Sequence, residues 1–252
     1  MKNNPEWIQA TFSKHFNDEV FAGFSLANKH IHLDDSARID GYNMGLNKLE
    51  KGEIVLKNRE RFFGTLLGES PKIASASQTH GNNVQEAVVG EIHKDTDALF
   101  TAKINLLLLI QVADCAPIIL YNRRSRKIAA VHAGWKGAVA NILPKTLELL
   151  CTQAEDIKQT YAAIGPCISK QAFEVGEEVA EQFPSIYVDR TIGPKPHVDL
   201  KAFLMNQLLD FGLRESSIEV DQTCTYRNNE YCYSHRKSGE KAGRMAAFIM
   251  LR

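Results

Sequence analysis

The chain has 252 residues, and its 30 Lys and Arg residues balance 30 Asp and Glu residues. A formal net charge of zero argues against a nucleic-acid-binding protein, because contacts to phosphates need a basic surface. The N-terminus lacks an apolar stretch of signal-peptide length, and the run INLLLLIQVA is about half of a bilayer span, so we expect a cytoplasmic protein that binds no membrane.

Strand and helix patterns alternate along the whole chain. In chain order, the patterns predict a helix over residues 57–69, strands over 72–78, 104–113, 116–121 and 127–133, a helix over 137–151, a strand over 159–165, helices over 169–183 and 199–212, and strands over 217–222 and 244–251. Several strands are apolar without alternation, which is typical of strands covered on both faces. No repeat or linker divides the chain, so we expect one domain over residues 1–252, of the α/β or α+β class.

End signals accompany three of these helices. Pro144 is expected to kink the helix over 137–151 or to mark a boundary within it. Ser169 is the expected N-cap of the helix over 169–183. Asp199 is the expected N-cap of the helix over 199–212, and Gly212 should follow its last turn.

One predicted strand end carries a histidine. In SASQTHGNNV, the strand ends at Gln78, and His80 stands before Gly81 and two asparagines. This composition is a turn signal. Taken alone, His80 is more typical of an ordinary surface loop than of a functional site.

A second strand end places a carboxyl group beside a thiol. In ADCAPIIL, Asp114 and Cys115 stand just before Pro117. An unpaired buried carboxylate is costly, so Asp114 must have partners or solvent. The five cysteines are odd in number and form no Cys-x-x-Cys motif, so we expect no disulfide framework. The alternative to a functional role is an inert core thiol at Cys115 and a turn cap at Asp114.

A third strand end, in VHAGWKGAVANIL, places His132 before a glycine-rich turn into a helix. Free N–H groups at a helix N-terminus suit an anion, and glycines let a ligand approach the backbone. The alternative is a tight strand-to-helix turn with Trp135 packed in the core.

The three strand ends together suggest a metal site. Two histidines and one thiolate are a ligand set of catalytic zinc, with the fourth position left open, so His80, Cys115 and His132 are the candidate ligands. Zinc would deprotonate the thiol. A hydrolase with Cys115 as nucleophile and His132 as base fits the same residues.

The chain also resembles a known family from about residue 20 to the C-terminus. The blocks QTHGNNV, DALFT, ADCAPIIL, AVHAGWKG, IGPCI, FEVG and YSHRKSGEKAGRMAAFI occur in the order seen in the laccase-domain family. Its members have been called multicopper polyphenol oxidase-like proteins, purine nucleoside phosphorylases and, in some bacteria, peptidoglycan editing factors. The resemblance implies mixed β-sheets packed together and flanked by helices, in one domain.

The resemblance also implies a site. Zinc (Zn²⁺) would be held by His80, Cys115 and His132. Asn43 in YNMGLN and Arg59 in KNRERF match the family's Asn-x-Gly and Asn-Arg elements, so both are candidate substrate-binding residues of the pocket, and Arg59 resembles the arginine that faces the metal. Its guanidinium fork would suit phosphate. The alternative for Arg59 is an exposed helix charge.

The implied substrates are a purine nucleoside and phosphate. The family's reported activities are phosphorolysis of adenosine, inosine or methylthioadenosine, and deamination of adenosine. Asp114 could carry a proton beside the metal, and Lys136 is a weaker candidate than Arg59 for phosphate. Trp135 or Tyr42 could stack on the purine. The His-x-Glu and Pro-Cys-x-x-Cys signature of zinc nucleobase deaminases is absent, so deamination would need a different design.

Two other functions stay open. The first is copper-dependent polyphenol oxidation, which needs many histidines, whereas this chain has eight and one His-x-His pair, at His30 and His32. Copper could still occupy such ligands, because it outcompetes zinc. The second is a role outside nucleosides, either as a Cys–His hydrolase that edits peptidoglycan precursors or as a partner-binding protein with a relic site.

Two segments leave questions about the substrate. The loop GFSLANKHIHLDDS lacks the Thr-Arg and paired glycines that the family usually has after Gly-Phe-Ser, so substrate preference is open. The C-terminal segment could form part of the pocket wall or pair the last strands, and for Ser234 and Arg244 we expect the second. His235 and Arg236 receive no role from the sequence.

Overall fold

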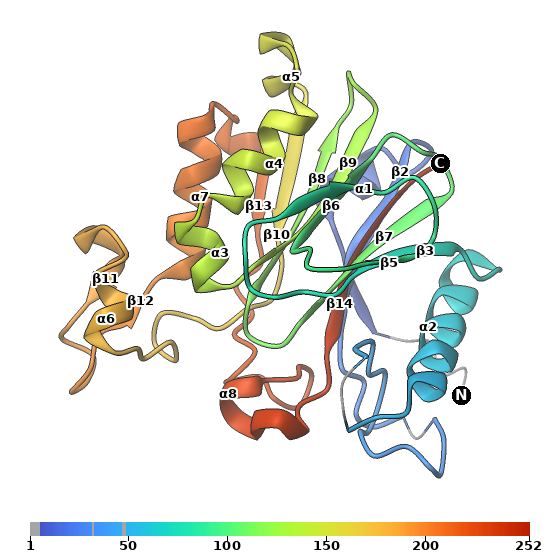
Figure 1. Ribbon diagram of the computed structural model, residues 1–252, viewed down its shortest axis with the longest axis horizontal. Coiled ribbons are helices and arrows are strands. Elements are labelled where there is room, and N and C mark those ends of the chain that lie inside the picture. The colour runs from blue at the N-terminus through green and yellow to red at the C-terminus, as the bar shows by residue number, and fades with distance from the viewer. Residues whose placement is uncertain (1–5, 32, 47–48) are drawn as a thin grey trace.

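The computed structural model describes residues 6–31, 33–46 and 49–252, and it confirms a mixed α/β fold in one domain. Two six-stranded mixed sheets lie face to face, and helices cover their outer faces (Figure 1). None of the helices in the described ranges is long and apolar enough to cross a membrane.

The first sheet contains the C-terminal strand near its centre. Its order is β1 (Trp7–Gln9), β2 (Val20–Ser25), β14 (Met245–Leu251), β7 (Leu106–Val112), β3 (Lys72–Ala76) and β5 (Ile92–His93). Antiparallel pairs join the first four strands, and β3 runs parallel to both of its neighbours.

The second sheet carries the segments that build the site. Its order is β13 (Ile218–Val220), β10 (Thr160–Ile164), β8 (Ala116–Asn122), β9 (Lys127–Ala133), β6 (Ala98–Thr101) and β4 (Val84–Glu86). A separate small sheet pairs β11 (Val188–Asp189) with β12 (His197–Val198). The long helices are α2 (Gly52–Leu67), α4 (Ile142–Leu150) and α7 (Leu200–Phe211), and the shorter ones are α1 (Thr11–His15), α3 (Trp135–Val139), α5 (Ala154–Ile157), α6 (Glu177–Ala180) and α8 (His235–Ser238). Single 3₁₀ turns cover Ser185–Tyr187, Glu215–Ser217 and Gly239–Lys241.

Strand β7 shows why the chain folds into four layers. Leu108 and Ile110 join the apolar cluster between the sheets, whereas Leu107 and Leu109 join the cluster beneath α2. A strand that is apolar at every position must bury both faces, and each fully buried Leu or Ile contributes about 1.5–3 kcal/mol. The second sheet has the same design, because its outer face packs against α4 and α7.

The strand predictions are confirmed at all seven positions, with ends displaced by a few residues. Strands β1, β2, β4, β5, β6, β11 and β12 were missed, six of them because they have only two to four residues. The prediction for α7 is confirmed at both ends. The Asp199 side chain accepts a hydrogen bond from the amide of Ala202 at 3.1 Å, and Gly212 has φ = +108° after the last turn.

Two helix predictions need correction. The region 137–151 forms two helices, α3 and α4, separated at Asn141, which has φ = +59°. Pro144 lies in the first turn of α4, where a missing N–H is tolerated. In the region 169–183, only Glu177–Ala180 is α-helical. The amide of Val175 donates to the Pro196 carbonyl at 2.9 Å, so the chain is extended there, and the Ser169 hydroxyl caps nothing.

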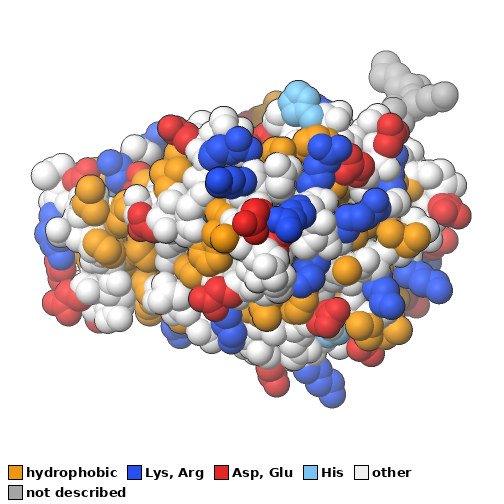
Figure 2. Space-filling model, turned by 90° about the horizontal axis from the view of Figure 1, so that it is seen from above, with side chains coloured by type: hydrophobic (Ala, Val, Ile, Leu, Met, Phe, Trp, Pro, Cys, Tyr) orange, Lys and Arg blue, Asp and Glu red, His pale blue; other side chains and the backbone are white. Residues whose placement is uncertain are grey.

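Charge is mixed on the molecular surface. On the face shown in Figure 2, basic and acidic side chains are interspersed. That face therefore presents no extended basic patch of the kind that binds nucleic acid.

Candidate metal centre and adjoining cavity

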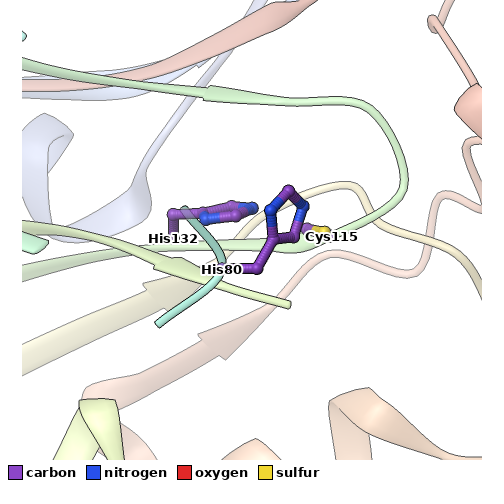
Figure 3. A group of neighbouring side chains, drawn as sticks. All are labelled: His80, Cys115 and His132. Carbon is purple, nitrogen blue, oxygen red and sulfur yellow. The ribbon is translucent and has the colours of Figure 1, made fainter. Parts of the chain in front are cut away.

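The β8–β9 hairpin brings two of the predicted ligands together. The strands are antiparallel, with Ala116 opposite Ala133 and Pro117 opposite His132. Cys115 immediately precedes β8, so its thiol lies beside the C-terminal end of β9, where His132 is found. His80 approaches from the loop that follows β3 (Figure 3).

The three predicted ligands converge. One ligand atom of each of His80, Cys115 and His132 lies within 4.8 Å of the other two. The two imidazole rings lie with their centroids 4.8 Å apart and their planes at 79°. In the described ranges, no other group of three or more His, Cys, Asp or Glu residues has this geometry. We call these three residues the ligand cluster.

Asp97, just before β6, organises two of the ligands. Its carboxylate is fully buried, and one oxygen (Oδ1) lies 2.7 Å from Nδ1 of His132 and accepts from the amide of His80 at 3.0 Å. The other oxygen (Oδ2) accepts from the Gly81 amide at 2.8 Å and from the amide and hydroxyl of Thr79, both at 3.2 Å. His132 therefore turns Nε2 toward the ligand cluster, and Asp97 also holds the turn in which His80 adopts φ = +62°.

Gly134 leaves the room that the ligand cluster needs. A Cβ atom at this position would lie 3.1 Å from the Cys115 sulfur and 3.2 Å from Cδ2 of His80. Any side chain there would press on two of the three ligands. The expected helix N-terminus at this turn is the start of α3, which has only five residues, and we assign no anion site to it.

Cys115 and His132 shift each other's pKa. Burial would raise the pKa of Cys115, but the charge of His132 and hydrogen bonds from both histidines lower it overall. Burial would lower the pKa of His132, but Cys115 and Asp97 raise it overall. The thiolate form of Cys115 is therefore favoured. Two imidazoles and one thiolate, two of them at the ends of β8 and β9 and one on the loop after β3, fit a zinc-like divalent ion with three protein ligands.

The ligand cluster forms part of the wall of a cavity of about 590 Å³. This volume lies in the range of small-molecule sites. Both apolar and polar side chains line it. The apolar lining includes Leu46, Ile92, Trp135, Ile168, Phe173 and Leu200, and the polar lining includes Ser77, Gln78, Gln111, Asp114, His235, Arg236 and Arg244.

Asp114 lies in the cavity wall, but its carboxylate is already bonded. It accepts from the Thr225 hydroxyl at 2.6 Å, the Ser234 hydroxyl at 3.1 Å and the Arg236 amide at 2.6 Å. The expected partners of this buried carboxylate are therefore present. They tie residues 225–236 to the strand that presents Cys115, an arrangement that suits a structural anchor.

Asn43 and Arg59 lie outside the cavity lining, in contrast to the expectation for both. The Arg59 side chain is buried on α2, and its Nε and Nη2 donate to the Met44 carbonyl at 3.0 and 2.7 Å. Asn43 is fully buried and accepts from the amides of Gly45 and Arg244 at 3.1 and 2.9 Å. The reading of Arg59 as an exposed helix charge also fails.

Of the aromatic and lysine candidates for substrate binding, one lines the cavity and two do not. Trp135 lines the cavity. Tyr42 is buried against Phe62, with ring centroids 5.4 Å apart, and does not line it. Lys136 is exposed, with its Nζ 5.6 Å from the centroid of the Trp135 ring, and it also lies outside the cavity lining.

Sequence reasoning missed several residues of the site. Asp97 stood in the quoted block DALFT without a role, and Gly134 was taken only as part of a glycine-rich turn. Arg244 was expected to pair strands, but it lines the cavity, together with His235 and Arg236. Of the single His-x-His pair, His30 is exposed and His32 lies outside the described residues.

Comparisons with known proteins identify the family of the chain. A family model described as multi-copper polyphenol oxidoreductase laccase matches residues 31–252. Relatives named purine nucleoside phosphorylase include one from Bacteroides thetaiotaomicron, 36% identical over 197 residues (74% of this chain, 68% of the relative). YlmD of Bacillus subtilis is 30% identical over 261 residues (97% and 92%), and YfiH of Escherichia coli is 32% identical over 220 residues (84% and 87%).

Solved structures extend the agreement to the fold. The hypothetical protein YfiH of Bacillus licheniformis superposes with a TM-score of 0.87 at 25% identity, covering 100% of this chain and 98% of that one. YlmD of Geobacillus stearothermophilus gives a TM-score of 0.82 at 27% identity, covering 92% of each chain. The chain therefore belongs to the multi-copper polyphenol oxidoreductase laccase family, whose members include relatives named purine nucleoside phosphorylase.

Proposed function

We propose that this protein is a zinc-dependent purine nucleoside phosphorylase. In this reaction the bond between the purine and C1′ of the ribose breaks, a bond from C1′ to a phosphate oxygen forms, and the base leaves with a proton. Adenosine, inosine and methylthioadenosine are the proposed substrates. The observation that carries the proposal is a ligand cluster in the wall of a cavity that aromatic and cationic side chains also line, in a chain whose relatives bear this name.

The apolar part of the lining suits the nucleobase. Trp135, Ile168 and Phe173 all line the cavity. Aromatic rings offer a flat surface on which a purine can stack, with about 1–3 kcal/mol per stacked base. We propose Trp135 as a stacking residue. The cationic side chains that line the cavity offer charge for the second substrate, phosphate.

The ligand cluster suits the metal. His80, Cys115 and His132 would hold the ion, and Asp97 would fix the tautomer and orientation of His132. A divalent ion held there would act as a Lewis acid toward a substrate oxygen. Because Asp114 is bonded to three donors, we propose that it holds residues 225–236 in place and does not transfer a proton itself.

The test is an assay of metal-defined protein. Adenosine, inosine and methylthioadenosine are incubated with and without phosphate, and free base and ammonia are quantified by chromatography. The proposal predicts phosphate-dependent release of base. Cys115→Ala should abolish this activity and lower the metal content together. The matched control is Cys151→Ala, because Cys151 is also half-buried but lies at the opposite end of the β8–β9 hairpin, near Asn122.

Other outcomes contradict the proposal in favour of a specific alternative. Release of ammonia without phosphate would indicate a deaminase. Loss of an amidase activity in Cys115→Ala, with the metal retained, would indicate a Cys–His hydrolase acting on peptidoglycan precursors. Several copper ions per chain together with phenol oxidation would indicate a polyphenol oxidase.

A further inference from the structure

We propose that Arg244 anchors phosphate in this cavity, and that Arg59 and Asn43 act on phosphate only by positioning Arg244. This inference rests on the proposed phosphorylase function, because it assigns the binding site of the second substrate.

Arg244 is a desolvated cation without a carboxylate partner. It lies one residue before β14, lines the cavity and is half-buried. Its Nη1 donates to the carbonyls of Ala242 and Gly243. Nε and Nη2 donate to no acceptor in the described ranges, and no described carboxylate lies within 4.0 Å of the guanidinium. Burial lowers the pKa of Arg244, a sign that water no longer fully solvates its charge. A bound anion would supply the missing acceptors.

The other cationic candidates are less suited to this role. Arg236 is exposed, its Nη1 already donates to the Glu174 carbonyl at 2.9 Å, and its guanidinium lies 5.9 Å from the centroid of the Phe173 ring. Lys136 and Arg59 do not line the cavity. Arg244 is thus the cavity-lining cation that combines partial burial with unbonded donors.

Residues 43–45 fix the position of Arg244. The Asn43 side chain accepts from the Arg244 amide at 2.9 Å, and the Met44 amide donates to the Arg244 carbonyl at 2.8 Å. Gly45 lets the arginine stem lie directly on the backbone, because a Cβ at Gly45 would fall 2.3 Å from Cγ and 2.5 Å from Cβ of Arg244. The Cβ and Cγ atoms of Arg244 cannot move away from such a methyl group without moving the guanidinium.

Helix α2 in turn fixes residues 43–45. Arg59 donates two hydrogen bonds to the Met44 carbonyl, and the neighbouring Asn58 side chain donates to the Asn43 carbonyl at 3.1 Å. Arg59 is therefore a positioning residue, two contacts removed from the cavity. Its charge holds one peptide unit, and that peptide holds the backbone of Arg244.

The first experiment compares Arg244→Gln and Gly45→Ala with two matched controls. Both variants should raise the KM for phosphate about 10- to 100-fold, the loss expected for charge-assisted hydrogen bonds. The KM for nucleoside should change less than about threefold, and the metal content should not change. Arg124→Gln removes an exposed arginine beyond the far end of β8, and Gly64→Ala adds a methyl group where no atom lies within 4 Å. Both controls should match the wild type.

The second measurement separates this inference from the proposed function. Calorimetric titration of the metal-loaded protein with inorganic phosphate needs no turnover. If phosphate binds and Arg244→Gln weakens it, the anion site stands even when no nucleoside is cleaved. If phosphorolysis occurs but Arg244→Gln leaves both the KM and the Kd for phosphate within about twofold, the inference is overturned and the function stands. Arg244→Lys, which keeps charge without the fork, serves if Arg244→Gln does not fold, and it should give an intermediate loss.

A double-variant cycle tests the role of Arg59. Arg59→Met should raise the KM for phosphate, and Arg59→Lys, which can still donate to the Met44 carbonyl, should restore part of the loss. Adding Arg59→Met to Arg244→Gln should cause little further increase, because both changes act through one guanidinium. Equal increases in both backgrounds would show that Arg59 acts independently, and that result would overturn its assignment as a positioning residue.

Discussion

Replacing Asp97 by Asn probes the support of the ligand cluster without changing side-chain volume. The buried carboxylate presents both oxygens to donors, and an asparagine keeps only one acceptor oxygen. If the amide nitrogen takes the Oδ1 position, His132 and the amide of His80 lose their acceptor. If it takes the other position, the amides of Thr79 and Gly81 lose theirs.

The expected magnitude follows from this count of donors. In either orientation two N–H groups lose their present acceptor, but Thr79 and His80 are exposed and Gly81 is half-buried, so Asp97→Asn should lose only about 1–3 kcal/mol of stability in the metal-free protein. The loss of a group that orients a metal ligand typically weakens metal binding about 10- to 100-fold. One perturbation should therefore lower both quantities.

The assay combines two measurements at neutral pH. Urea unfolding of the metal-free protein gives the free energy of unfolding, and competition with a chelator gives the affinity for zinc. Asp95→Asn is the control, because Asp95 is exposed, lies two residues away and has φ = +48°, which asparagine tolerates. If Asp97→Asn retains the zinc affinity and the stability of the wild type, the role assigned to Asp97 is wrong.

Three further substitutions test other parts of the structure. Gly134→Ala should weaken zinc binding about tenfold in the same competition assay while leaving metal-free stability nearly unchanged, because its methyl group presses on two ligands; unchanged affinity would show that the ligand cluster has room to spare. Asp114→Asn should cost about 1–3 kcal/mol in urea unfolding, with catalysis lost only as far as folding is; a full loss of turnover in a stable protein would restore a proton-transfer role. Glu19→Gln should lower stability at pH 7 by less than about 1 kcal/mol, since hydrogen bonds from Arg123 and Tyr121 lower the pKa of Glu19. That difference should begin to shrink as the pH falls below the ordinary pKa of a glutamate, about 4.3, and should vanish once the folded protein also binds the proton; a difference that stays constant through acid pH would contradict the pairing.

The layers of the fold could be predicted from the sequence where the local pattern of apolar residues and helix-end residues matched the burial in the structure. The uninterrupted apolar run of β7 required cover on both faces, and it received cover from the second sheet and from α2. At α7 the N-cap Asp199 and the glycine at 212 defined both ends. Over residues 169–183 the apolar spacing matched a helix, but Phe173 and Val175 reach the core from an extended segment. Periodicity alone does not distinguish these two ways of burying the same residues.

The convergence of the candidate ligands could be predicted because Cys115 precedes β8, His132 lies near the end of β9 and His80 lies in the turn after β3, where a fold can gather distant side chains. Asp97 was not, because an acidic residue before a short strand has no distinctive pattern. Its importance comes from strand pairing, which sets Ala98 opposite Val131 and so places Asp97 beside His132.

Which of Arg59 and Arg244 lines the cavity could not be predicted from the sequence. Arg59 lies on the buried face of a helix, and Arg244 lies at the start of a strand, so local sequence alone favoured neither for the cavity. Residues 43–45 lie between the two arginines. They pair with the backbone of Arg244, which lines the cavity, and they accept hydrogen bonds from Arg59, which does not line it. Long-range pairing of this kind leaves no local signal in the sequence.

The most direct test of the metal centre is X-ray absorption spectroscopy of protein purified without added metal, together with its metal content. The structure predicts about one zinc per chain, with two nitrogen ligands at ~2.0–2.1 Å and one sulfur at ~2.3 Å, and loss of the sulfur scattering in Cys115→Ala. A metal shell without sulfur in the wild type, or one that Cys115→Ala leaves unchanged, would contradict the assignment of His80, Cys115 and His132 as the metal ligands.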